Sequence, residues 1–330
     1  MTNVFLSPKF SDSDVVHIAF ILVEQFSLFA LACVSEPLRV ANRLAGKKLF
    51  EFSFISEDGN PVKASNNIAF NTQYSTANCP DDYQTFIVVS GFDPLVYASK
   101  SLLAELRRLA AKGVSLGGVD TGAQILIKAR VMTGLRATMH WEAATSFQEN
   151  NPNADILQER FLIEDNRVSS AGGISGLDMM LSIIAVNNGQ NLALDVAEQF
   201  TYNSIQNSDD SQRMSIRTRL MTSNRKLIKA AAIMEKNLNK NLSIKEISSQ
   251  ASISQRKLER LFALKLDTSP KQYYRKMRLE QARCLLRQTD MSVLDVSIAC
   301  GFSSAAYLSA IYKQEFNIQP SKDRNEQQVF

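Results

Sequence analysis

A turn with the sequence Gly-Val-Asp-Thr-Gly carries the residue with the clearest chemical potential in the first half of the chain. Asp120 lies at its centre, after the apolar run Val114–Val119 and before the helical run Ala123–Ala129. A sharp strand-to-helix turn of this kind has the shape of a nucleophile elbow, which lifts one side chain above a helix N-terminus. A carboxylate there attracts a cation, and the adjacent helix N-terminus attracts an anion. The pattern therefore predicts a site for a small zwitterion.

Other residues complete this candidate site. Ser90-Gly91 ends the neighbouring strand-like run, and His140-Trp141 combines one of the two His with the only Trp of the chain. An indole face favours a quaternary ammonium or guanidinium group through cation–π contact. The backbone N–H groups of Gly91, Thr121 and Gly122 are expected to hold a carboxylate. The expected ligand-binding residues are Glu36, Ser90, Gly91, Asp120, Thr121, His140 and Trp141.

A structural interpretation of these residues stays open. Asp120 also fits the cap of the helix that follows it, and His140-Trp141 also fits a packed core pair. Glu36 fits a solvent-exposed position on the helix expected over Leu28 to Leu44.

A second chemical pattern lies near the C-terminus. Arg256, Glu259 and Arg260 have helical i, i+3 and i+4 spacing, on the face opposite the apolar residues. Arg pairs bidentately with guanine, and Glu accepts from cytosine N4, so this face predicts contact with base edges. Gln255 and Lys257 are better placed for phosphate or base-edge contacts. A solvated charged face is the alternative interpretation.

The region around this helix is repeated. Ser254–Pro270 matches Ser304–Pro320 at an offset of 50 residues, with apolar pairs at helical spacing. Each copy begins near a Ser and ends before a Pro, so each predicts one amphipathic helix. In the second copy Ala310 matches Arg260, and small residues take the recognition positions. The expected DNA-binding residues are Gln255, Arg256, Lys257, Glu259, Arg260, Ser303, Ser304, Ala305, Ala306 and Lys313, the last for phosphate.

Each repeated helix is preceded by a shorter one. The first short helix carries Ile244 and Ile247, and the second carries Val293 and Val296 before a turn at Gly301. Short helix, tight turn and second helix form a helix-turn-helix unit. Between the two units, Lys271 to Arg287 predicts one long helix. We expect sequence selectivity to come mainly from the first unit.

Strand and helix patterns alternate in the N-terminal region. This alternation predicts a doubly wound α/β domain with a mainly parallel sheet, whose ligands bind at the carboxyl ends of strands. Val62 to Ser65 is expected to pair with Phe50–Ser56 as a hairpin. The other expected strands are Val15–Val23, Thr85–Ser90 and Val114–Val119, and the expected helices are Leu28–Leu44, Leu102–Lys112 and Ala123–Ala129.

Charge divides the chain into two parts. From Ser211 to Phe330 there are 22 Lys and Arg against 10 Asp and Glu, a net charge of +12, whereas the remainder carries −8. An acidic body joined to a basic region predicts a polyanion partner for the second part only. We expect an N-terminal tail over 1–13, an α/β domain over 14–205, a polar linker over 206–215 and an all-α domain over 216–330.

Composition excludes several classes of protein. Hydrophobic residues make up 45% and charged residues 21%, as in ordinary soluble globular proteins. The start of the chain lacks signal-peptide features, and no apolar run is long enough for a membrane span. The four Cys are scattered without metal-ligand spacing. We therefore expect a cytoplasmic protein with reduced thiols, no metal and no cofactor.

The C-terminal repeat resembles the AraC-type family of transcription regulators over roughly the last 100 residues. The resemblance rests on Ser254–Phe262, Ser269-Pro270, Arg278-Leu279, Ala282, Leu285-Leu286, Ile298–Phe302 and Pro320 to Arg324. It implies two helix-turn-helix units joined by a rigid helix, each with a recognition helix in the major groove. Asp267 and Asn317 stand where the family commonly has glycine, and Ala310 where it usually has Arg.

The N-terminal region resembles the DJ-1/PfpI, or class I glutamine-amidotransferase-like, fold from about Asp14 to Ser204. The carrying segments are Ser90-Gly91, Gly117–Ala123, Ala137–Glu142 and Ser170–Asp178. The whole chain is most similar to the GlxA-type regulators, which fuse this domain to an AraC-type domain. Catalytic members of the superfamily place Cys at the elbow, where this chain has Asp120, so the resemblance implies binding rather than cysteine chemistry.

Together these features predict a DNA-binding transcription regulator, an activator that responds to a small amine or amino-acid-like compound. It resembles regulators that respond to glycine betaine, carnitine or arginine. The expected partners are double-stranded DNA, this zwitterionic effector, RNA polymerase and a second copy of the chain, without a membrane. Two alternatives stay open: a cysteine-less hydrolase, and a constitutive DNA-binding protein whose first domain only dimerises.

Overall fold

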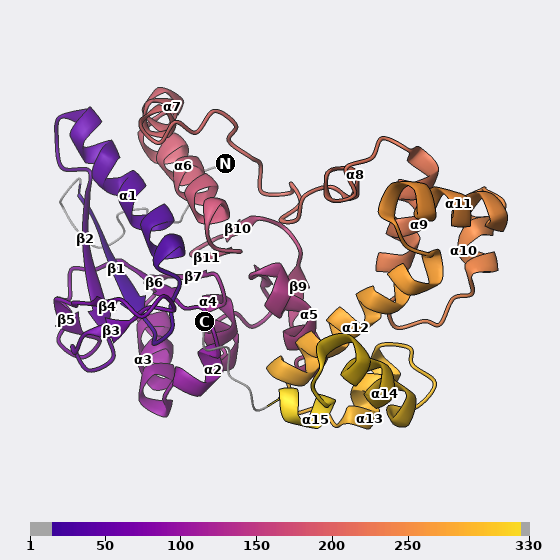
Figure 1. Ribbon diagram of the computed structural model, residues 1–330. Helices are drawn as coiled ribbons and strands as arrows, with labels where there is room; N and C mark the ends of the chain where they lie inside the picture. The colour runs from indigo at the N-terminus through magenta and orange to yellow at the C-terminus, as the bar shows by residue number, and fades with distance from the viewer. Residues whose placement is uncertain (1–14, 325–330) are drawn as a thin grey trace. The chain divides into compact units, whose positions relative to one another are not determined.

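Two compact units make up the chain in the computed structural model, which describes residues 15–324 (Figure 1). The first unit is Met1–Gln212 and the second is Arg213–Phe330. The N-terminal tail expected over 1–13 lies outside the described residues.

The first unit is built on a seven-stranded sheet in the order β10-β11-β7-β6-β1-β2-β5. All neighbouring strands are parallel except β10 and β11. The strands are β1 (Val16–Leu22), β2 (Phe50–Ser56), β5 (Tyr74–Ser75), β6 (Thr85–Val89), β7 (Ser115–Val119), β10 (Phe161–Glu164) and β11 (Arg167–Ser170). The pairs β3 (Val62–Lys63) with β4 (Ala69–Phe70) and β8 (Arg136–Thr138) with β9 (Asp155–Leu157) form two small sheets.

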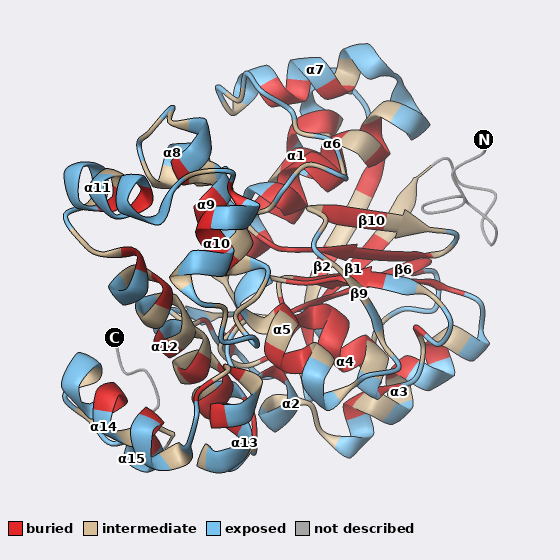
Figure 2. Cartoon of the chain, turned by 90° about the vertical axis from the view of Figure 1, so that its right-hand side faces the viewer, coloured by how far each residue is buried: buried red, intermediate tan, exposed pale blue. Residues whose placement is uncertain are grey.

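Helices cover both faces of the large sheet (Figure 2). One apolar core joins it to α1 (Leu28–Ala45), α6 (Ile174–Asn188) and α7 (Gln190–Gln199). The other joins it to α3 (Lys100–Ala111), α4 (Gly122–Lys128) and α5 (Trp141–Asn150), and α2 (Pro94–Tyr97) is a single turn after β6. The central strands β6 and β7 are buried throughout, as expected for parallel strands covered on both sides. The predicted doubly wound α/β fold is confirmed.

One predicted strand pairing is wrong. Val62 and Lys63 pair antiparallel with β4, whereas β2 pairs in parallel with β1 and β5. The short connection after Phe50–Ser56 contains Asp58-Gly59, a common hairpin turn, but β2 has both edges occupied inside the large sheet.

The second unit is helical. Its helices are α8 (Ile216–Arg219), α9 (Arg225–Glu235), α10 (Ile244–Gln250), α11 (Gln255–Leu266), α12 (Pro270–Gln288), α13 (Val293–Ala299), α14 (Ala305–Phe316) and α15 (Pro320–Asp323). The pairs α10–α11 and α13–α14 are the two predicted helix-turn-helix units, and α12 is the predicted long helix between them. No helix among the described residues is both long and apolar enough to cross a membrane.

Matching caps explain why the repeat folds twice in the same way. The Ser254 side chain accepts from the backbone N–H of Lys257 at the start of α11, and Ser304 does the same for α14. Asp267 and Asn317 end these helices in the left-handed conformation, with φ of 48° and 57°. Asp and Asn tolerate this conformation better than most side chains, so the two departures from glycine preserve the helix ends.

The segment that follows α7 packs against the first unit. The backbone N–H of Gln206 donates to buried Asp178 at 3.0 Å, and the N–H of Arg160 donates to the Ser208 carbonyl at 2.9 Å. Gln212 donates its side-chain amide to the Glu159 carbonyl at 2.7 Å. The region expected to be a linker over 206–215 is therefore held to the first unit as far as residue 212.

Candidate functional site

Asp120 adopts the strained backbone of an elbow, with φ of 64° at the end of β7. The glycines on either side make this turn possible. A Cβ atom on Gly118 would lie 2.4 Å from the Ala123 nitrogen, and one on Gly122 would lie 2.3 Å from the Val88 carbonyl oxygen. Both contacts are far below van der Waals distance, so the spacing of the two glycines creates the geometry that displays Asp120.

Two neighbouring segments fix the position of Asp120. Its N–H donates to the Ser170 carbonyl at 3.0 Å, and its carbonyl accepts from the N–H of His140 at 3.1 Å. Gly172 closes the opposite side, because a Cβ atom there would lie 2.9 Å from both Cβ and Oδ2 of Asp120. The structure therefore brings the β11–α6 turn and the start of α5 together around one carboxyl group.

The electrostatics of this cluster favour a positive ligand. Burial, reinforced by the nearby Glu142 carboxylate, raises the pKa of Asp120 to about 7. Among residues 15–324, no cation pairs with the Asp120 carboxyl group. Burial also lowers the pKa of His140, which therefore stays neutral near pH 7 and adds no positive charge. An incoming cation would complete the ionisation of Asp120.

Ser90 and Thr121, the residue after Asp120, tie two strand ends together. The Thr121 hydroxyl donates to the Gly91 carbonyl at 2.6 Å, so it accepts from the Ser90 hydroxyl at 2.8 Å. Both side chains are buried. A Cβ atom on Gly91 would lie 2.4 Å from the Gln25 carbonyl oxygen, which explains the glycine there. These residues therefore hold the end of β6 against the turn that carries Asp120.

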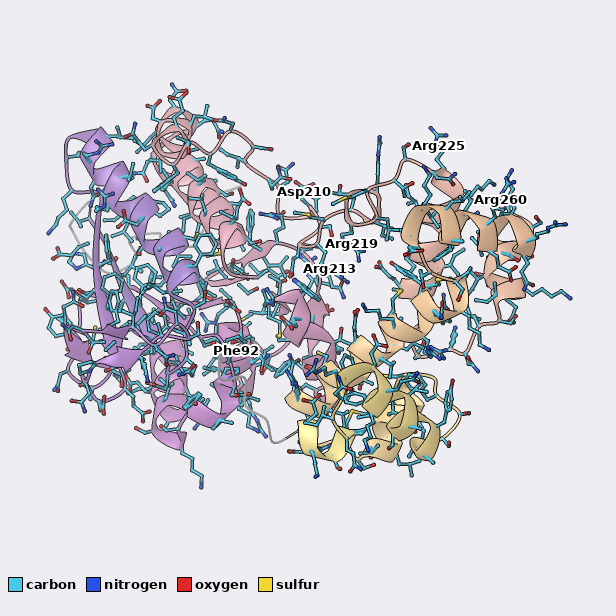
Figure 3. The ribbon with its side chains drawn as sticks, viewed as in Figure 1. Phe92, Asp210, Arg213, Arg219, Arg225 and Arg260 are labelled. Atoms are coloured by element: carbon cyan, nitrogen blue, oxygen red, sulfur yellow. The ribbon has the colours of Figure 1, made fainter. Side chains whose placement is uncertain are left out.

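Exposed aromatic residues lie in the segments that flank the elbow. Trp141 is 37% exposed and its ring centroid lies 5.6 Å from that of His140. Phe29 and Phe92, which the sequence reasoning missed, are 59% and 54% exposed. Phe29 packs near Gly173, and Phe92 (labelled in Figure 3) follows Gly91 at the end of β6. For Phe92, an apolar residue directly after Ser90-Gly91 was the available signal.

Glu36 has a different partner in the structure. It is on α1, where its carboxylate pairs with Arg39 at 2.6 Å. None of the interactions of the described residues joins it to Asp120.

The α11 helix presents a polar ridge. Gln255, Arg256, Lys257, Glu259 and Arg260 are all exposed, while Leu258 and Phe262 are buried beneath them. Figure 3 shows Arg260 on the outer side of this helix. The Gln255 amide donates to Glu259 at 2.9 Å, which holds that carboxylate in place. Leu264 continues the ridge, is 71% exposed and was missed by the sequence reasoning.

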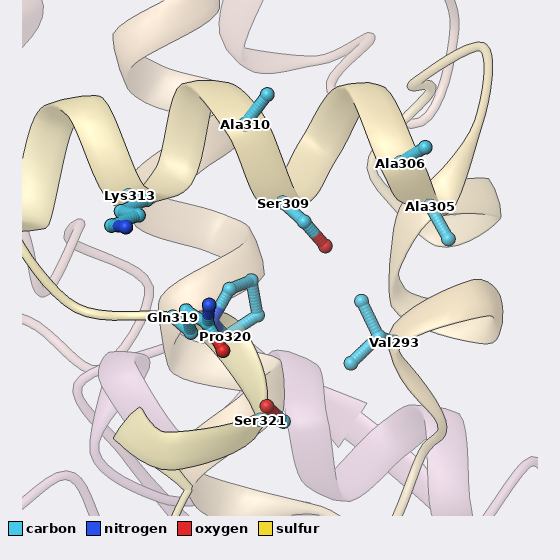
Figure 4. A pocket seen from close by; sticks show the side chains of 9 residues that line it. All are labelled: Val293, Ala305, Ala306, Ser309, Ala310, Lys313, Gln319, Pro320 and Ser321. Atoms are coloured by element: carbon cyan, nitrogen blue, oxygen red, sulfur yellow. The ribbon is translucent and has the colours of Figure 1, made fainter.

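The α14 helix presents a hollow rather than a ridge. A groove of about 490 Å³ runs along it (Figure 4). Ser303 and Ser304 are exposed just before the helix, and exposed Tyr307 on α14 was not predicted. The groove is lined by Val293, Ala305, Ala306, Ser309, Ala310, Lys313, Gln319, Pro320 and Ser321.

Comparison with known proteins identifies the two units. Residues 17–186 match the DJ-1/PfpI family, and residues 247–326 match a helix-turn-helix domain. The HTH-type transcriptional regulator CdhR of Pseudomonas aeruginosa is 42% identical over 92% of this chain and 90% of its own length. The chain belongs to the GlxA-type regulators, which join a DJ-1/PfpI domain to an AraC-type helix-turn-helix domain.

Other relatives place this GlxA-type regulator in the same group. GbdR of Pseudomonas aeruginosa is 36% identical over 94% of this chain and 84% of its own length, and GlxA of Rhizobium meliloti is 31% identical over 95% and 97%. Both are named HTH-type transcriptional regulators. The crystal structure of an AraC family transcriptional regulator from Pseudomonas putida superposes with a TM-score of 0.51 at 27% identity, over 56% of this chain and 99% of that chain. The protein is therefore a DNA-binding transcription regulator.

Proposed function

We propose that this regulator changes its effect on transcription when a small zwitterionic amine binds at Asp120. The observation that carries the proposal is the half-buried carboxyl group of Asp120, whose pKa is raised by burial and by Glu142 and which has no cationic partner among the described residues. A quaternary ammonium or guanidinium group would supply the missing charge, and the exposed Trp141 face favours such a cation. The amide groups at the start of α4 would hold the carboxylate.

The proposal also covers the partners of the regulator. We infer that the effector makes the protein activate genes of amine or amino-acid catabolism, through contact with RNA polymerase, as a homodimer in the cytoplasm. A ligand achieves this only by binding one conformational state more tightly than the other. The relatives' shared name, transcriptional regulator, supports the outline of this scheme.

The first unit would bind the effector without transforming it. The DJ-1/PfpI fold includes enzymes, but here Asp120 takes the position of the elbow nucleophile. Burial raises the pKa of Cys33 to about 11 and that of Cys79 to about 12, so neither supplies a thiolate at neutral pH. Turnover of methylglyoxal or an amide that is abolished by Asp120→Asn would instead support a hydrolase.

A thermal-shift experiment tests the proposed effector site. Glycine betaine, carnitine and arginine are added to the full-length protein and to its Asp120→Asn and Asp195→Asn variants, the latter changing an exposed Asp on α7. We expect at least one compound to raise the Tm of the wild type and of Asp195→Asn, but not of Asp120→Asn. No stabilisation of the wild type by any amine or amino acid would favour a constitutive DNA-binding protein.

A further inference from the structure

The two helix-turn-helix units have separate apolar cores. Figure 1 shows α12 running from the α9–α11 group to the α13–α14 group. Tyr274, near the start of α12, is buried in the first core with Leu258 and Phe262. From Leu279 onward the buried residues of α12 belong to the second core, together with Leu308. The single helical turn between Tyr274 and Leu279 is therefore the junction of the two cores.

Arg278 lies in this turn and contacts both sides of the junction. Its guanidinium carbon lies 4.6 Å from the ring centroid of Tyr274 and 5.1 Å from that of Phe302. Its Nη1 donates to the side chain of Asn241 at 3.1 Å and to the carbonyl of Gly301 at 2.9 Å. Asn241 precedes α10 of the first helix-turn-helix unit, whereas Gly301 and Phe302 form the turn of the second helix-turn-helix unit. One planar group thus bridges segments 60 residues apart.

The environment of Arg278 is costly for a charge. Burial lowers its pKa, and its Nε is buried without a hydrogen-bond partner. No carboxylate pairs with it among residues 15–324, so two rings, a carbonyl and an amide oxygen hold the guanidinium. A buried charge held in this way adds little stability by itself, and its value lies in fixing one geometry.

A second contact at the junction depends on Gly301. This residue has φ of 67°, and a Cβ atom on it would lie 3.1 Å from the backbone of Asn239 and 3.2 Å from the Leu238 carbonyl oxygen. The turn of the second helix-turn-helix unit therefore lies directly on the backbone of the loop before α10. Because the backbone at Gly301 lies this close to that of Leu238 and Asn239, a small shift of Arg278 would change the angle between the two helix-turn-helix units.

We propose that Arg278 is a positioning residue that fixes the distance and angle between recognition helices α11 and α14, and thereby the spacing of the two DNA segments they contact. Two recognition helices held in one chain reach successive major-groove segments, about 10 base pairs apart along one face of the duplex. Their spacing on DNA is a geometric consequence of the protein's own junction. Weakening the junction should therefore relax spacing without removing the contacts made by α11.

Spacing selectivity tests this proposal. A duplex bound by the full-length wild type is first selected from random DNA, and the two protected patches are located by hydroxyl-radical footprinting. Affinity is then compared between this duplex and one with two extra base pairs between the patches. We expect the insertion to weaken the wild type at least about tenfold, which corresponds to the loss of one good contact.

The variants separate positioning from general folding. In Arg278→Met the insertion should weaken binding less than about threefold. Footprinting should show that the DNA patch contacted by α11 stays protected, whereas protection of the patch contacted by α14 becomes diffuse. Arg278→Lys keeps the charge but not the planar group and should fall between. Lys276→Met, on the exposed face of α12, should behave as the wild type. Because each variant is judged by the ratio of its affinities for the original duplex and the duplex with the insertion, a loss of binding that affects both duplexes equally does not change the result.

The proposal would be overturned if Arg278→Lys, folded by circular dichroism, showed the wild-type footprint and the wild-type insertion ratio. Because this conservative variant keeps the positive charge, it provides a decisive result even if Arg278→Met does not fold.

Discussion

The side-chain amide of Gln212 donates to the carbonyl oxygen of Met139 at 3.1 Å, one residue before His140. It also donates to the Thr138 hydroxyl at 3.0 Å, and the Gln212 Oε1 is buried without a hydrogen-bond partner. His140 in turn donates its N–H to the carbonyl of Asp120. The last residue of the first unit is thus bonded to the loop that also holds the elbow.

We therefore expect Gln212→Ala to uncouple effector binding from regulation. The variant should bind effector and DNA as the wild type does, yet lose about twofold or more of the effector-dependent change in transcription, since coupling residues contribute roughly 0.5–2 kcal/mol. A reporter driven by a bound promoter measures this change. Gln206→Ala is the control, because among residues 15–324 the side-chain amide of Gln206 bonds to Ser204 alone. A wild-type response from Gln212→Ala would contradict the coupling.

Gly172→Ala should destroy the proposed effector site. The added Cβ would collide with Asp120, and the backbone already has φ of 83°. Gly134→Ala is a matched control, because that glycine has φ of 75° with nothing within 4 Å of the added Cβ. We expect both variants to lose about 1–3 kcal/mol of unfolding free energy in denaturant titrations. Only Gly172→Ala should also lose the effector-induced thermal shift, and retention of that shift would show that Gly172 does not shape the site.

The sequence predicted those features that depend on local patterns. The 50-residue repeat with its serine caps located both helix-turn-helix units, and the glycines around Asp120 located the elbow. The sequence did not predict that Gly172 closes over Asp120 or that Phe29 lies near Gly173. Those contacts depend on the order of strands in the sheet, which brings β11 beside β7 across 50 residues of chain. The same limitation explains the wrong pairing of Val62 with β2.

The ionisation of Asp120 makes stability depend on pH. Its pKa is about 7 in the folded protein and about 4 in an unfolded chain, so the folded state binds more protons between these values. Unfolding free energy therefore falls as pH rises from about 4 to about 7. Asp120→Asn removes this penalty. Its unfolding free energy should exceed that of the wild type by a margin that grows over this range to about 4 kcal/mol, since each unit of pKa shift corresponds to about 1.4 kcal/mol, and the margin is constant above it.

Denaturant titrations at pH 4, 6 and 8 check this margin, with Asp195→Asn as the control. A margin that does not change with pH would contradict the raised pKa of Asp120. The same ionisation should make the wild type bind a cationic effector more tightly at pH 8 than at pH 6, because the carboxylate is then fully charged. Asp120→Asn, which has no carboxylate at this position, should show no effector-induced thermal shift at either pH.

Arg260→Ala should reduce specificity for DNA more than general affinity. Arg260 is exposed on the polar ridge of α11, where a guanidinium can pair with a guanine edge at a cost of about 1–3 kcal/mol if lost. We expect specific binding to weaken about tenfold or more and binding to random duplex to change about twofold. Lys236→Ala, which removes an exposed positive charge after α9, should change both alike. Titrations of the specific and the random duplex at several salt concentrations distinguish base contact from phosphate contact. A residue that contacts only phosphate would lower specific and non-specific binding equally, and its loss would reduce the slope of log affinity against log salt concentration by about one.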